Sequence, residues 1–139
     1  TLARQPLPVV ATLHPAEVYD AADRAALDAL SHHPRFSLVT RPAADLIATC
    51  AFVVTQNSSL ALHAMIAGKG AVLFADIDFH HPAGSVPRDG LDRAFQIGQH
   101  PPADMTGYLW WFFKQNAIDA QSPEALARIR ALLTAQGWP

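Results

Sequence analysis

Apolar stretches alternate with amphipathic stretches along this chain, and the alternation predicts strands that are each followed by a helix. The run 7–13 is β-branched and uncharged, which is typical of a buried strand. The next stretch, 16–30, has acidic residues early and small apolar residues on one face, so it predicts a helix. Further along, the pattern predicts a strand at 36–40, a short helix at 43–49, a strand at 51–55, a helix at 58–67 capped by Gly68, and a strand at 71–75.

The second half of the chain is less regular. Proline and glycine recur through 76–90, which predicts a long loop, and 94–97 is interpreted as a short edge strand. A helix is predicted at 104–117, and a last helix begins at Ser122 and ends near Gln136.

The order of these elements predicts an α/β fold, namely a Rossmann-like doubly wound parallel sheet with additional C-terminal helices. The strands are apolar throughout, as strands covered by helices on both faces are. Right-handed crossovers then place every strand-to-helix turn at one edge of the sheet, where ligands of such folds bind. We expect one domain over 1–139. Because the chain begins with Thr1, we also expect it to be part of a longer protein.

The residues at this predicted edge are mostly polar. They are His14, Pro15, Arg41, Gln56, Asn57, Ser58, Ser59 and the segment 76–81. Ser58 and Ser59 open a helix, where hydroxyls and unpaired N–H groups attract phosphate, although simple N-capping explains them equally well. His14 could donate to a phosphate oxygen or serve only as a turn residue, and its placement beside the serines favours binding.

Other candidates are weaker. His80 and His81 lie near Asp76 in the predicted loop, and we interpret that loop as closing over a ligand and expect no metal site. Cys50 lies in an apolar run with no basic neighbour, which disfavours a nucleophile.

Composition narrows the function further. Of 139 residues, 50% are hydrophobic and 16% charged, with a net charge of −2, which predicts a folded core. No block of lysine and arginine exists, so we expect no nucleic-acid partner. No apolar run reaches the length of about 20 residues that spans a bilayer. The single cysteine fits a reducing compartment, and we expect a cytoplasmic location, including a peripheral one at the inner membrane.

Six bulky apolar residues, Tyr108–Phe113, follow one another in the predicted helix at 104–117. Such a run covers every side of a helix, so one domain cannot bury it all. We expect it to support homo-oligomerisation or contact with another partner.

The segment FVVTQNSSLALHAMIAGKGAVLFADIDFHHPAG, residues 52–84, resembles the capsular polysaccharide biosynthesis glycosyltransferases. These enzymes use a CMP-activated 3-deoxy-octulosonic acid or a related sugar, and bacterial sialyltransferases share their motifs. The resemblance implies the C-terminal half of a GT-B enzyme, with a His-Pro motif at His14-Pro15 and a Ser-Ser motif at Ser58-Ser59 that hold the CMP phosphate. The similarity covers residues 8 to 84.

The resemblance implies that His14 acts in catalysis by stabilising the leaving phosphate. It also implies a CMP-sugar donor as ligand, the N-terminal half of the same protein as partner and supplier of the general base, and no cofactor. The implied substrate-binding residues are His14, Pro15, Gln56, Asn57, Ser58, Ser59, His63, Asp76 and His80. The family pattern Gly-x-Glu-Ala reads Ala61 and His63 at its Gly and Glu, so His63 stands where a carboxylate often contacts ribose. Two alternatives stay open: a non-catalytic module that binds a phosphorylated metabolite or a protein, and a UDP-sugar epimerase-like fragment.

Overall fold

The computed structural model describes residues 1–138 and divides into two compact units, Thr1–Pro102 and Ala103–Pro139. Each unit is described here by itself. The prediction of one domain over 1–139 stays a prediction, because a compact unit is not the same thing as an independently folding domain.

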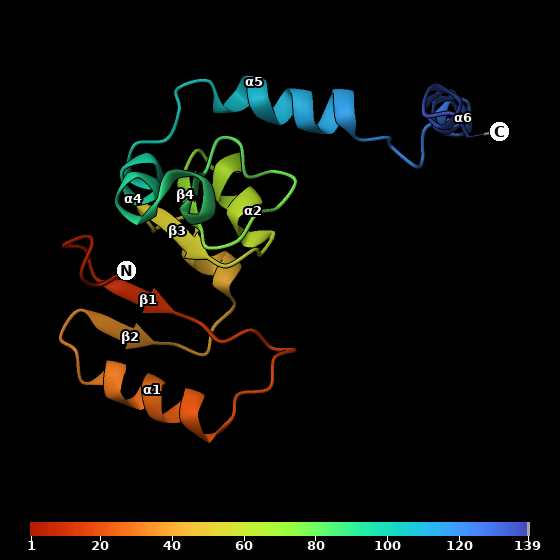
Figure 1. Cartoon of the computed structure of the whole chain (residues 1–139). Helices are drawn as coiled ribbons and strands as arrows, with labels where there is room; N and C mark the ends of the chain where they lie inside the picture. The colour runs from red at the N-terminus through yellow and green to blue at the C-terminus, as the bar shows by residue number, and fades with distance from the viewer. Residues whose placement is uncertain (139) are drawn as a thin grey trace. The chain divides into compact units, whose positions relative to one another are not determined.

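The first unit holds short parallel strands and the helices between them (Figure 1). Its elements are β1 (Val9–Ala11), α1 (Ala21–Ser31), β2 (Phe36–Leu38), the 3₁₀ helix η1 (Ala43–Leu46), β3 (Phe52–Thr55), α2 (Leu60–Ile66), β4 (Gly70–Leu73), β5 (Gly84–Ser85), α3 (Val86–Asp89) and α4 (Leu91–Gln99). Every predicted element up to residue 75 is therefore present, but each is shorter than predicted.

The strands form two separate parallel sheets. In one, β1 pairs with β2, with Val9 opposite Phe36. In the other, the order is β3-β4-β5, with Phe52 opposite Gly70. The α/β class with parallel strands is therefore confirmed. A single continuous sheet is not shown, because no ladder joins β1 to β3 among the described residues.

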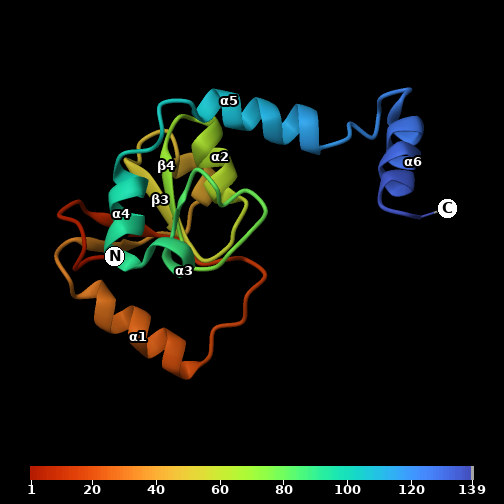
Figure 2. The same cartoon turned by 45° about the horizontal axis from the view of Figure 1, so that its top comes forward.

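The core of the first unit lies on β4 and its covering helices. All four residues of β4 are buried, and α2 and α4 cover opposite faces of β3 and β4 in both views (Figures 1 and 2). Val72 packs with Ala94 and Phe95 of α4, and the ring of Phe95 meets that of Phe52 edge-on at 6.1 Å. These contacts make β3-β4-β5 with α2 and α4 a packed α/β/α sandwich.

Helix α4 comes unusually close to the sheet because glycines line the contact. A Cβ built on Gly70 would stand 1.9 Å from the carbonyl oxygen of Gly98, and one on Gly84 would stand 2.0 Å from that of Ala94. Neither Gly70 nor Gly84 has a positive φ, so space and not backbone conformation requires glycine there. Gly68, by contrast, has φ 71° and ends α2 as predicted.

Two predictions for 76–99 are wrong. The expected edge strand at 94–97 lies inside α4, and the expected loop at 76–90 contains β5 and α3. The sequence contains the i, i+3, i+4, i+7 spacing of a helix face at Leu91, Ala94, Phe95 and Gly98. This spacing indicates a helix at 91–99.

The segment Val9–Leu38, which comprises β1, α1 and β2, has no buried side chain. Asp20 and Asp23 form a capping box at the start of α1, and for this reason the helix begins at Ala21 and not at residue 16. Val10 is 48% exposed and Leu13 is 42% exposed. This βαβ segment is therefore well formed locally but carries no core of its own.

The second unit is helical, as the sequence predicts for 104–117 and the C-terminus. It contains α5 (Met105–Trp110), the π-helix η2 (Trp111–Asn116) and α6 (Ala125–Ala135). Asp104 accepts a hydrogen bond from the Gly107 amide at 2.9 Å and so caps α5.

Replacing Gly70 by alanine should lower the free energy of unfolding by about 3 kcal/mol or more, because the new methyl group meets backbone that cannot move aside. Gly68→Ala is the matched control, since nothing lies within 4 Å of its Cβ and only the positive φ is strained. That control should cost about 1 kcal/mol. Urea unfolding of both variants measures the difference. An equal or smaller loss at position 70 would contradict the close contact between α4 and β4.

Candidate functional site

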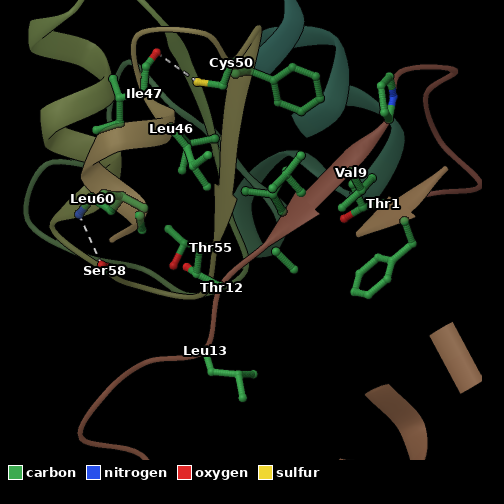
Figure 3. Close-up of a pocket in the computed structure, with 18 of the residues that line it drawn as sticks. Thr1, Val9, Thr12, Leu13, Leu46, Ile47, Cys50, Thr55, Ser58 and Leu60 are labelled. Atoms are coloured by element: carbon green, nitrogen blue, oxygen red, sulfur yellow. Dashed lines mark hydrogen bonds between the residues drawn. The ribbon is translucent and has the colours of Figure 1, made fainter. Parts of the chain in front are cut away.

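A cavity of about 1300 Å³ lies between β1 and β3 in the first unit (Figure 3). Its walls come from both strands, from the segment that precedes β1, and from η1 and the residues after it. Figure 3 shows Thr12, the residue after β1, and Thr55, the last residue of β3, at the same end of the cavity. The cavity therefore occupies the place where a continuous sheet would join the two strands.

The chemistry of the cavity wall favours an anion. Among the described residues that line it, none is an aspartate or a glutamate. Arg41 supplies a positively charged side chain. Hydroxyls are supplied by threonines and by Ser58, and most of the remaining wall is aliphatic. A wall with cationic and hydroxyl donors and no carboxylate attracts phosphate or carboxylate groups and repels cations.

His14 lies at this cavity, three residues after β1 ends. Its backbone N–H donates to the Tyr19 hydroxyl at 2.9 Å, and its Nδ1 accepts from the Ala16 N–H at 3.3 Å. An Nδ1 that accepts places the proton of the neutral ring on Nε2. His14 therefore has the turn role of the simpler interpretation. Its Nε2–H can in addition donate a hydrogen bond to a ligand oxygen.

Ser58 lies at the same cavity, three residues after β3 ends. Its Oγ accepts a hydrogen bond from the Leu60 N–H at 3.2 Å, which is a local turn bond (Figure 3). The N-cap residue of α2 is Ser59, and its side chain makes no capping hydrogen bond, so the predicted capping by Ser58 is wrong. A hydroxyl that accepts this bond still has its own proton to donate. The local turn bond and ligand binding are therefore compatible in this residue.

The backbone amides at the start of α2 are less available than the sequence suggested. Leu60 N–H bonds to Ser58 Oγ, Ala61 N–H to the Ser58 carbonyl, and His63 N–H to the Ser59 carbonyl. The helix also begins at Leu60 and not at Ser58, and it has seven residues. Anion binding at this end therefore depends on side chains.

The structure brings together His14, Pro15 and Ser58 of the predicted substrate-binding residues, together with Arg41, which was also predicted at this edge. The other predicted residues do not line the cavity; these are Gln56, Asn57, Ser59, His63, Asp76 and His80. Ser59 and His63 are exposed, and His80 Nδ1 makes a close contact with the Ile77 carbonyl oxygen.

Asp76 belongs to a polar network that sequence reasoning missed. The fully buried Ser85 donates from Oγ to Asp76 at 3.1 Å and from its N–H to Asp89 at 2.9 Å. Arg88 binds both Asp89 oxygens, at 2.9 and 2.7 Å, and donates to the carbonyl oxygens of His80, His81 and Ala83. This network holds the segment 76–85 in place, so its polar groups serve structure.

Two remaining chemical candidates are unsupported. Burial raises the pKa of the Cys50 thiol, and its Sγ donates to the Ile47 carbonyl oxygen at 3.4 Å, which is a structural role. Within residues 1–138, no three His, Cys, Asp or Glu side chains are close enough to hold a metal ion. No helix in the same range is both long and apolar enough to cross a bilayer.

Comparison with known proteins identifies no relative. No family model, no curated protein and no solved structure matches this chain significantly.

Asp89→Asn should lower the free energy of unfolding at pH 7 by about 1–2 kcal/mol, because it removes one charge-assisted partner of Arg88. The hydrogen bond from Arg88 lowers the pKa of Asp89, so this stabilisation is complete above the ordinary pKa of an aspartate. It is lost as the pH falls through the lowered value. Urea unfolding at pH 7 and pH 3 should show a deficit for the variant that shrinks at pH 3.

Asp78→Asn is the control, since that carboxylate is exposed on the same segment. It should change stability by less than about 0.5 kcal/mol at either pH. An Asp89→Asn deficit that is independent of pH would contradict the ion pair.

Proposed function

We propose that this chain is the nucleotide-sugar-binding half of a glycosyltransferase of bacterial surface polysaccharide synthesis, with a CMP-activated sugar as donor. The observation that supports it best is the cavity lined by His14, Arg41 and Ser58 with no carboxylate among its described lining residues. The finer fold expectation, a Rossmann-like doubly wound half-domain, belongs to the same proposal.

The proposed roles follow from the donors available. His14 would donate from Nε2 to an oxygen of the departing phosphate, and the Ser58 hydroxyl would donate to a second oxygen. Arg41, exposed at the cavity, would balance the negative charge. One well-oriented donor lowers a barrier of this kind by about 3–4 kcal/mol.

The missing carboxylate has a mechanistic consequence. An acceptor hydroxyl needs a general base to remove its proton. The described residues of the cavity wall include no aspartate or glutamate that could serve as this base. In this proposal the base comes from the N-terminal half of the intact protein, so the present chain binds the donor but does not transfer the sugar by itself.

Millimolar CMP should give binding heat with the wild-type chain in isothermal titration calorimetry, and Ser58→Ala should weaken binding about tenfold through the loss of one charge-assisted hydrogen bond. Ser59→Ala is a matched control, because the neighbouring serine does not line the cavity and should bind as wild type. A melting curve separates lost binding from the loss of stability that follows when the Leu60 N–H loses its partner. Absence of heat with CMP, UMP and phosphate alike would contradict the proposal, and preference for UDP would favour the epimerase-like alternative.

A second function is favoured by the second unit. Trp110 is 57% exposed and Trp111 46%, and both lie in the aromatic run Tyr108–Phe113. Large exposed aromatic side chains of this kind are typical of contact surfaces. The alternative is a non-catalytic module that acts through this surface.

If that alternative holds, light scattering should report a concentration-dependent dimer or larger species for the wild-type chain, and Trp110→Ser should shift it toward monomer. Leu126→Ser is the control, since Leu126 is equally exposed at 58% but lies on α6. A wild-type chain that stays monomeric at every concentration, or equal effects of both variants, would contradict self-association through the aromatic run.

A further inference from the structure

Helix α6 carries an apolar face that the described part of its own unit leaves open. The i, i+3, i+6, i+7 spacing of one helix face is filled by Leu126, Ile129, Leu132 and Leu133, which are between 41% and 58% exposed. Among the described residues of α6, Ala125 alone is buried, and the helix has no extensive contact with α5 or η2. Removing leucine and isoleucine side chains from water is favourable, so this face favours a covering surface.

One arginine borders this apolar face on each side. At about 100° per residue, Arg128 lies about 40° beyond Leu132, and Arg130 lies about 40° beyond Leu126. Both arginines are exposed, and neither has an ion-pair partner among residues 1–138. Helix α6 contains no aspartate and no glutamate. The apolar face is therefore bordered by positive charge alone, and we expect the surface that covers it to supply negative charge.

A tryptophan follows the carboxyl end of the same face. Gly137 has φ 81°, and its N–H donates to the Thr134 carbonyl oxygen at 3.0 Å. The Trp138 N–H donates to the Leu133 carbonyl oxygen at 2.9 Å. These two bonds form a Schellman motif, which fixes the backbone of Trp138 beside the last turn of the helix. Trp138 is 66% exposed, and tryptophan is enriched where an apolar phase meets water.

The charge pattern favours a lipid surface over a second copy of α6. A second copy offers no carboxylate to Arg128 and Arg130, whereas paired helices normally carry charges of both signs beside their apolar seam. An anionic bilayer supplies negative headgroups along both borders and an apolar phase beneath them. Arginine side chains reach the headgroups while their methylene groups stay on the apolar side.

The size of the helix and the charge of the chain fix how such a contact is made. Helix α6 has 11 residues, which is too short to cross a bilayer, so it would lie in the plane of the interface. The net charge of the whole chain is −2, so attraction to an anionic surface is local. The chain would therefore meet the bilayer with α6 first.

We infer that α6, extended by Trp138, is a docking surface for a bilayer that contains anionic phospholipids. The apolar face enters the boundary between headgroups and acyl chains, and Arg128 and Arg130 bind lipid phosphates. This inference goes beyond the proposed function and does not rest on it, because no residue of α6 lines the cavity between β1 and β3.

Vesicle flotation with the whole chain tests this inference, because vesicle-bound chain rises in a density gradient and self-associated chain does not. Vesicles made of equal parts of phosphatidylcholine and phosphatidylglycerol should carry the chain upward. Vesicles of phosphatidylcholine alone should bind it at least tenfold less tightly, because the two arginines then lose their partners. Binding to the mixed vesicles should also weaken at 1 M salt, where the Debye length is about 3 Å.

Arg128→Gln with Arg130→Gln should weaken binding to the mixed vesicles about thirtyfold, since each arginine near an anionic surface contributes a factor of about five. Arg24→Gln with Arg93→Gln is the matched control. It removes the same charge from exposed arginines on α1 and α4 and should bind as wild type.

Leu132→Ser should weaken binding about tenfold or more, because one large apolar side chain no longer leaves water. Ala131→Ser is the matched control, since Ala131 is exposed on the opposite side of the same helix and should bind as wild type. Both changes introduce serine into α6, so they lower helix propensity by similar amounts.

Absence of wild-type flotation with the mixed vesicles, equal binding to phosphatidylcholine alone, or equal losses in a variant and its control would each overturn the inference. A change in oligomeric mass caused by Leu132→Ser without lipid would also overturn it, because a second copy would then cover α6. Titration with CMP uses no lipid, so a chain that floats but shows no CMP heat keeps this inference and loses the proposed function.

Discussion

The contact between α4 and β4 is the interaction on which the rest of this structure depends. Gly70 and Gly84 on the sheet let the backbone of α4 approach until no methyl group would fit, and Val72, Ala94 and Phe95 fill the space beside them. Burying one large apolar side chain contributes about 1.5–3 kcal/mol, and close packing adds dispersion on top. The position of β3, and with it the wall that carries Thr55 and Ser58, follows from this contact.

The N-terminal βαβ segment shows what happens without such a contact. Its helix has a complete capping box and its strands pair in register, yet none of its side chains is buried. Local hydrogen bonds form the elements, but they do not place a sheet against a core, because the net free energy of a hydrogen bond is small beside that of burial. The cavity between β1 and β3 exists for this reason.

The candidate site depends on the same geometry. Two residues far apart in sequence, His14 and Ser58, share one cavity because each follows a parallel strand by the same number of residues. Spacing of this kind is visible in a sequence once the strands are known. Arg41 is brought to the cavity by the connection after β2, and its value as a charge partner depends on the absence of carboxylates from the described wall. Asp76, also predicted for the site, instead bonds to Ser85, a partner nine residues away that no local pattern reveals.

Local patterns by themselves determined the α/β class, the order of elements up to residue 75, the glycine at the end of α2 and the aromatic run after residue 107, because these depend on propensity, periodicity and backbone conformation. Tertiary structure alone decided that α4 packs against glycines of the sheet, that Asp76 bonds to Ser85, and that β1 and β3 stand apart across a cavity. The physical reason is that these features depend on burial and pairing between distant residues, and no window of neighbouring residues contains both partners.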